Sequence, residues 1–135
     1  MNKLLKNRLR ERANGLCEYC LSPESYSSSP FVGEHIIPIA KDGDDQLENL
    51  AFACAGCNNF KYDCVEAYDS VSGTWVPLFH PRQDVWSEHF RWNTNCTQMI
   101  GISPTGRATI QRLKLNRPQV TNLRKILFER GEHPA

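Results

Sequence analysis

Apolar residues near the start of the chain recur at helical spacing. Leu4, Leu5 and Leu9 are separated by lysines and arginines, so one side of a helix would be apolar and the other basic. Gly15 can adopt the left-handed conformation that often ends a helix. The pattern predicts an amphipathic helix over residues 2–14.

Two short apolar runs follow, with a polar segment between them. The runs cover residues 31–37 and 49–53, and the polar loop KDGDDQ separates them. Residues 56–65 are then compatible with a helix. The order strand, loop, strand, helix predicts a β-β-α unit.

The second half of the chain mixes strand and helix signals. Strands are expected over residues 75–79, 89–92 and 98–102, and helices over residues 103–115 and 116–131. The helix at 103–115 has a clear start, because Ser103 can cap it and Pro104 suits its first turn. The chain is therefore expected to have an α+β fold, with a small β-element and C-terminal helices after the β-β-α unit.

Aromatic residues gather in the same half of the chain, at Trp75, Phe79, Trp86, Phe90 and Trp92. Such side chains can stack on nucleic-acid bases, but clustered aromatic residues more often form a core. The pattern favours a core.

Composition limits the class of protein. The 135 residues are 40% hydrophobic and 23% charged, which suits one small globular domain or a catalytic module with an extension. We expect the N-terminal helix and the β-β-α core in residues 1–65, and an extension packing on that core in residues 66–135. No stretch approaches the roughly 20 apolar residues of a membrane span, and no secretory signal is evident. A cytoplasmic protein without a membrane partner is expected.

Charge is unevenly distributed, although the formal net charge is only +1. Residues 1–16 carry five basic residues against one acidic residue, residues 107–130 carry seven against one, and residues 17–106 carry four against twelve. Basic ends can attract nucleic-acid phosphates, but a solvated basic helix face is also common in proteins that bind no nucleic acid. Charge alone leaves the partner open.

Four of the six cysteines form two pairs at the spacing of zinc knuckles. The pairs are Cys17-x-x-Cys20 and Cys54-x-x-Cys57. Two such pairs can close a tetrahedral Cys₄ site, which leaves no open coordination position for water and therefore indicates a structural zinc. A redox-active C-x-x-C is the alternative, but the thioredoxin-like βαβ pattern that usually surrounds it is absent.

Polar residues around the second cysteine pair fall into a pattern that carries chemistry. Glu34-His35 lies within the first apolar run, toward its end, Asn49 begins the second, and Asn58 and Lys61 follow Cys57. The run GEHIIPIAKDGDDQLENLAFACAGCNNFK resembles the HNH, or ββα-metal, nuclease motif in its zinc-containing form. The segments PLFHPRQDVWSEHFRW and GISPTGRATIQRLKLNRP resemble the C-terminal extension of a bacterial HNH subfamily.

The resemblance implies a ββα-metal core and an endonuclease that hydrolyses DNA phosphodiester bonds. His35 would be the general base that takes a proton from water. Glu34 and Asn58 would offer oxygen ligands to a catalytic Mg²⁺ or Mn²⁺ ion, and Asn49 would brace the loop and orient His35. The expected products carry 5′-phosphate and 3′-hydroxyl ends.

Four basic residues are candidates for contacts with the nucleic acid, namely Lys41, Lys61, Arg117 and Arg124. Two other functions stay open. One is a zinc-containing module that binds nucleic acid without cutting it, although binding alone does not require the complete catalytic set. The other is an RNA-directed nuclease, because the same metal and base would serve either backbone.

Overall fold

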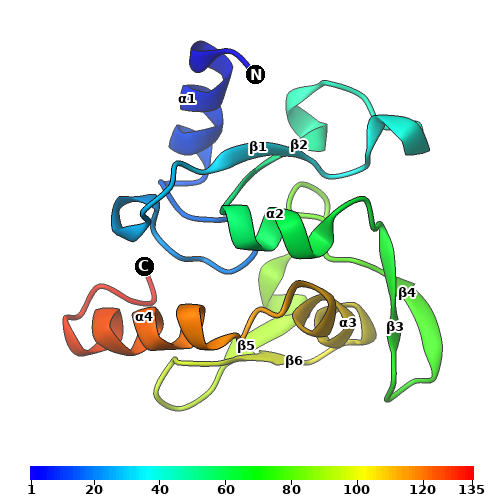
Figure 1. Cartoon of the computed structure of the whole chain (residues 1–135). Helices are drawn as coiled ribbons and strands as arrows, with labels where there is room; N and C mark the ends of the chain where they lie inside the picture. The colour runs from blue at the N-terminus through cyan, green and yellow to red at the C-terminus, as the bar shows by residue number, and fades with distance from the viewer. The chain divides into compact units, whose positions relative to one another are not determined.

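The first β-hairpin and the helix after it form the predicted β-β-α unit. In the computed structural model, which describes residues 1–135, β1 (Val32–His35) pairs antiparallel with β2 (Leu50–Ala53). The helix α2 (Ala55–Lys61) follows directly and lies beside the hairpin (Figure 1). The predicted order is confirmed, and β1 and α2 are each three residues shorter than predicted, whereas β2 is one residue shorter.

The chain divides into two compact units. Unit 1 comprises Met1–Val65 together with His80–Gln83, and unit 2 comprises Glu66–Phe79 together with Asp84–Ala135. Each unit buries apolar side chains of its own. None of the helices is both long and apolar enough to cross a bilayer.

Unit 1 begins with the expected amphipathic helix, α1 (Lys3–Arg12). The Asn2 side chain starts the helix by accepting a hydrogen bond from the backbone amide of Leu5 at 2.8 Å. At the other end, the Arg12 guanidinium donates to the carbonyl oxygens of Leu47, at 2.8 Å, and of Leu50. These bonds tie the end of α1 to the start of β2.

The strand β2 is the centre of the core of unit 1. All four of its residues are buried, with at most 1% of their surface exposed. The Phe52 ring packs against Phe31, with ring centroids 5.2 Å apart. A strand buried on both faces gives the hairpin a fixed register, in which His35 lies opposite Leu50. The last residue of β1 is therefore held at a defined position.

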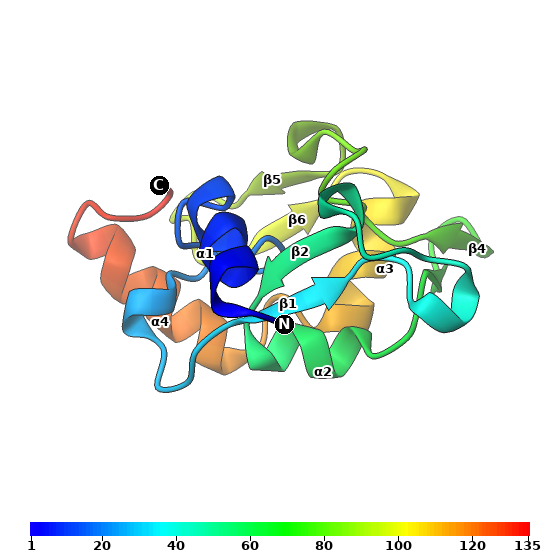
Figure 2. The ribbon, with the colours of Figure 1, turned by 90° about the horizontal axis from the view of Figure 1, so that it is seen from above.

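Unit 2 contains two further hairpins and two helices. The pairs are β3 (Glu66–Asp69) with β4 (Thr74–Pro77), and β5 (Phe90–Trp92) with β6 (Met99–Gly101). Figure 2 shows β5 and β6 side by side. The helices are α3 (Pro104–Leu113), which Ser103 caps as predicted, and α4 (Pro118–Glu129). The α+β fold is confirmed, and β3 is a strand that the sequence pattern did not predict.

Most of the aromatic residues form a core in unit 2, as expected. Phe90 contacts Phe79 at 5.2 Å and Trp86 at 5.6 Å between ring centroids, and Trp86 also contacts Trp92 at 5.6 Å. The expectation was wrong for Trp75, which is 66% exposed on β4. Its position in the hairpin turns it to the outer face, where its ring meets that of Tyr68 on β3.

Candidate active site and metal centre

The four knuckle cysteines meet in unit 1. Cys17 and Cys20 lie in the turn after α1, while Cys54 caps α2 and Cys57 lies in its first turn. Their sulfur atoms all lie within 4.8 Å of one another, and none of them forms a disulfide. A Zn–S bond of about 2.3 Å in a tetrahedron requires sulfurs about 3.8 Å apart. The Cys20 and Cys54 sulfurs are 3.8 Å apart, so the cluster has the size of a zinc site.

Electrostatics at this cluster also fit a metal centre. Burial raises the pKa of the Cys17 thiol, whereas the hydrogen bond with Cys17 lowers the pKa of Cys20 to about 7. Four sulfurs so close together, three of them on buried residues, cannot all be thiolates unless a cation lies among them. The chemistry of the donors therefore suggests structural zinc, held between the start of unit 1 and α2.

An open pocket of about 250 Å³ lies where the end of β1 faces α2. A water molecule occupies about 30 Å³ in the liquid, so this space admits a phosphate group with several waters. The residues that line the pocket are Gly33, Glu34, His35, Pro38, Ile39, Asn58, Tyr62 and Asp63. The structure thus brings together three of the four predicted catalytic residues, namely Glu34, His35 and Asn58.

The imidazole of His35 is held by an acidic residue of the loop between the strands. Its Nε2 atom lies 2.7 Å from Oδ1 of Asp45, and the two side chains are 34% and 82% exposed. A carboxylate at this nitrogen favours the tautomer that donates from Nε2 and leaves Nδ1 able to accept a proton. The sequence did not single out Asp45, because nothing in KDGDDQ distinguishes one acidic residue from the next.

Asn49 does not line the pocket but holds the loop beneath it. Its side-chain oxygen accepts from the Ile37 amide at 2.9 Å, and its side-chain nitrogen donates to the carbonyl oxygens of Ile37, at 2.9 Å, and Asp44, at 2.8 Å. Gly43 passes so close to the Ile37 carbonyl that any side chain there would overlap it. These contacts fix the path of the chain immediately after His35, as a bracing residue would.

Glu34 points into the interior of unit 1, where it forms an ion pair with Lys61. The Lys61 ammonium donates to Oε1 of Glu34 and to the carbonyl oxygen of Ile36 at 2.8 Å. The Tyr19 hydroxyl donates to the other oxygen, Oε2, at 2.7 Å. Burial, followed by the charge of Glu34, raises the pKa of Tyr19 well above its usual range, so Tyr19 stays a donor.

This buried ion pair bears on two of the predicted roles. Lys61 is 1% exposed and Glu34 is 4% exposed. The position of Lys61 argues against the expected contact with a phosphate, because its ammonium already has acceptors inside the protein. The sequence did not predict that Tyr19 bonds Glu34, because its place between Cys17 and Cys20 does not show where its hydroxyl points.

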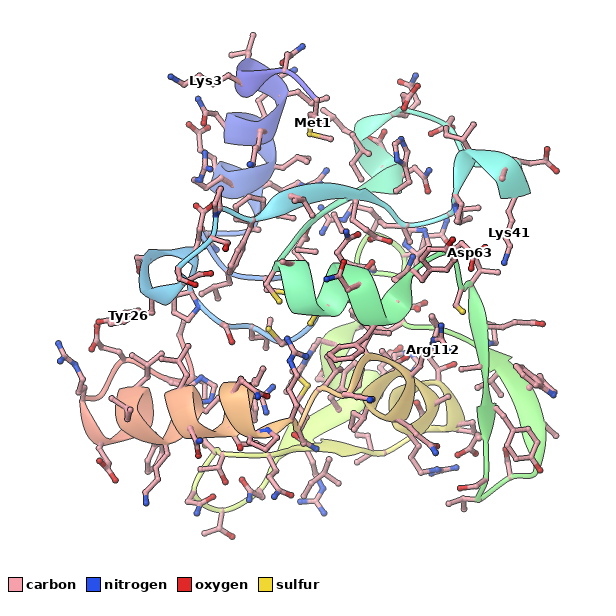
Figure 3. The ribbon with its side chains drawn as sticks, in the orientation of Figure 1. Met1, Lys3, Tyr26, Lys41, Asp63 and Arg112 are labelled. Atoms are coloured by element: carbon pink, nitrogen blue, oxygen red, sulfur yellow. The ribbon has the colours of Figure 1, made fainter.

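The other candidates for nucleic-acid contacts differ in exposure. Lys41 is exposed, and its ammonium donates to the carbonyl oxygen of Asp63 at 2.9 Å (Figure 3). Arg117 is half-buried and donates to the Leu113 carbonyl at 3.2 Å. Arg124 is 2% exposed, and its guanidinium lies 5.0 Å from the centroid of the Trp92 ring. Its burial gives Arg124 a packing role and argues against the expected nucleic-acid contact.

The structure thus contains a β-β-α domain with a four-cysteine cluster and an open pocket at the end of its first strand. Comparison with protein families finds that the model of the HNH endonuclease family matches residues 17–63. The chain therefore contains a domain of the HNH endonuclease family. Comparisons with curated proteins and with solved structures find no match.

Proposed function

We propose that this chain is a metal-dependent endonuclease that hydrolyses DNA phosphodiester bonds with His35 as the general base. One observation carries the proposal. Within a domain of the HNH endonuclease family, His35 and Asn58 line one open pocket, although they lie on different elements and 23 residues apart in the sequence. A role in folding alone would not require an open pocket at this point.

The residues around His35 suit the removal of a proton from water. Asp45 holds Nε2, and the pairing of β1 with β2 fixes the backbone of His35, so the imidazole presents Nδ1 as the accepting atom. The same carboxylate would stabilise the imidazolium that forms. The water would lie in the pocket, between His35 and the phosphorus atom that it attacks.

Asn58 fits the role of a ligand to Mg²⁺ or Mn²⁺ better than Glu34 does. Asn58 belongs to the pocket lining, and its side-chain oxygen is of the kind that Mg²⁺ prefers. Glu34 is only 4% exposed and its two oxygens accept hydrogen bonds from Lys61 and Tyr19 inside unit 1, so its carboxylate would have to turn toward the pocket to reach the metal. When bound, such an ion would stabilise the negative charge that develops on the phosphate and the leaving oxygen.

We further propose that Cys17, Cys20, Cys54 and Cys57 hold zinc for a structural purpose. None of the four lines the pocket, and the cluster joins the turn after α1 to α2. Lys41 and Arg117 stay as proposed nucleic-acid contacts, because neither side chain is fully buried.

The decisive experiment compares cleavage of supercoiled plasmid by the wild type and by His35→Ala. Each protein is incubated with Mg²⁺, with Mn²⁺ and with EDTA after circular dichroism has shown that both are folded. We expect the wild type to nick or linearise plasmid only with metal, and His35→Ala to be inactive. An Asp44→Ala variant changes the exposed acid next to Asp45, whose side chain accepts from the Gln46 amide and not from His35, so it serves as the matched control.

The same assay separates the alternatives. If both proteins bind DNA and neither cuts DNA or RNA, the domain is a binding module and the catalytic roles are withdrawn. If only RNA is cut and the cleavage requires His35, the enzyme is an RNA-directed nuclease with the same general base.

A further inference from the structure

Tyr62 occupies a backbone position that normally belongs to glycine. Its φ and ψ angles are 54° and −116°, close to the values of the second residue of a type II′ turn, which mirror those of type II. The turn is closed by a hydrogen bond from the Cys64 amide to the Lys61 carbonyl at 3.0 Å. A side chain at this position is strained, because its Cβ crowds the backbone.

The side chain of Tyr62 gains nothing within the fold that would offset this strain. It is 75% exposed, and its hydroxyl makes no hydrogen bond in the structure. By contrast, Asp42 and Lys114 also have positive φ but lie in the ordinary left-handed region, which non-glycine residues enter at lower cost. Strained residues of this kind concentrate at functional sites.

The turn that strains Tyr62 also places it at the pocket. Tyr62 lines the pocket together with His35 and Asn58. The Lys41 ammonium donates to the backbone of Asp63, the next residue, so a positive charge lies beside the same turn (Figure 3). Asp63 itself belongs to the pocket lining and carries a negative charge, so a phosphate bound there needs the cation of the proposed function.

We propose that the Tyr62 hydroxyl donates a hydrogen bond to a backbone phosphate of the bound DNA and is a substrate-binding residue of this site. The inference rests on the proposed function and deepens it. An exposed, unbonded phenol beside a lysine matches the donors that commonly hold phosphates, and such contacts position the backbone without reading its sequence. Tyr62 would thus help to place the scissile phosphate near His35.

The experiment measures binding of a labelled DNA duplex in the presence of Mg²⁺ for the otherwise wild-type protein, Tyr62→Phe and Tyr62→Gly, each carrying His35→Ala so that no cleavage occurs. Loss of one hydrogen bond to a charged phosphate should raise the Kd of Tyr62→Phe about tenfold. Tyr26→Phe changes a tyrosine that is 45% exposed and does not line the pocket, and its Kd should match the wild type. Equal affinity of Tyr62→Phe and the wild type would overturn the proposal.

Thermal unfolding and cleavage complete the test. Tyr62→Phe should unfold at the temperature of the wild type, whereas Tyr62→Gly should unfold a few degrees higher because the strain is relieved. A glycine variant that unfolds at a lower temperature would contradict the strain argument. If Tyr62→Gly binds weakly while Tyr62→Phe binds normally, the ring makes the contact and the role of the hydroxyl is refuted.

Cleavage with Mg²⁺ distinguishes this inference from the function on which it rests. If the wild type binds DNA and cuts nothing, the proposed nuclease function fails, whereas weaker binding by Tyr62→Phe still supports the phosphate contact. If the wild type cuts DNA in a His35-dependent way and Tyr62→Phe binds and cuts equally well, only the inference about Tyr62 fails.

Discussion

Replacing Lys61 with methionine is expected to destabilise the protein strongly, because it leaves Glu34 buried without its cationic partner. The two side chains are only 2% and 3% exposed, and the ammonium also donates to the Ile36 carbonyl at 2.8 Å. After the substitution, Tyr19 would be the remaining hydrogen-bond donor to the carboxylate. Methionine has nearly the length of the lysine side chain, so the change removes charge and hydrogen bonds with little loss of packing.

The size of this effect follows from the burial of the pair. Removing one partner of a buried ion pair costs about 3–5 kcal/mol, because the other charge stays in the interior uncompensated. A domain is typically stable by only about 5–15 kcal/mol. The substitution therefore removes a large part of the total stability, and unfolding in urea with saturating zinc should show it.

Two further variants make the measurement specific. Lys3→Met removes an exposed lysine of α1 and should change the stability by no more than about 0.5 kcal/mol. The double variant with Glu34→Met and Lys61→Met should recover most of the lost stability, because the interior accommodates apolar side chains of similar volume. Recovery should be incomplete, since Tyr19 then lacks an acceptor, which costs about 1–3 kcal/mol.

A loss of less than about 1 kcal/mol in Lys61→Met would refute this reasoning. Such a result would mean that the ammonium faces solvent and that its pairing with Glu34 contributes little. The original expectation of a phosphate contact for Lys61 would then gain support, and Lys61→Met should weaken DNA binding instead of stability.

The remaining predictions concern the metal, the general base and pH. Freshly purified protein should contain about one zinc per chain by elemental analysis, and Cys17→Ser should lose both zinc and folded structure. Asp45→Asn should slow cleavage about tenfold, which is part of the roughly 10²–10⁴-fold that general base catalysis supplies. The urea concentration at the midpoint of unfolding should not change. Normal cleavage would show that Asp45 does not orient His35. The Arg107 guanidinium, 2.9 Å away, holds the pKa of Asp69 well below its usual range. Because the folded-state pKa is depressed, this pair stabilises the protein above about pH 4 and ceases to do so as the pH falls further. Asp69→Asn should therefore show a smaller loss of stability between about pH 4 and pH 2 than the wild type shows.

The elements that the sequence predicted are those with strong local signals. Ser103 and Pro104 fix the start of α3, and the two apolar runs that became β1 and β2 are long enough to stand out. The strand β3 was missed because Ala67 is its one buried apolar residue, so no alternating pattern marks it. Trp75 was misplaced because aromatic content alone does not show which face of a two-stranded hairpin is covered.

Residue type and spacing predicted the pocket less completely than the metal cluster. The two C-x-x-C pairs have one simple way to meet, and the four sulfurs do meet. The contacts of Lys61 depend on a long, flexible side chain that points into unit 1 toward Glu34, and spacing along the chain does not give that direction. The turn at Tyr62 has no glycine or proline, and Asp63 is its only residue of a type common in turns, so the sequence gives little sign of it.

The arrangement of unit 1 explains why a structural metal should matter for chemistry at a site that it does not touch. Asn58 directly follows Cys57 on α2, and its amide donates to the Cys54 carbonyl at 3.0 Å, so the cluster sets the position of Asn58. His35 depends instead on β2, on Asn49 and on Asp45. Two separately anchored segments must therefore face each other across the pocket. The Glu34–Lys61 pair links them directly, and the zinc cluster links α2 to the turn after α1. Loss of either link should abolish cleavage by separating His35 from Asn58, even where each residue keeps its own chemistry.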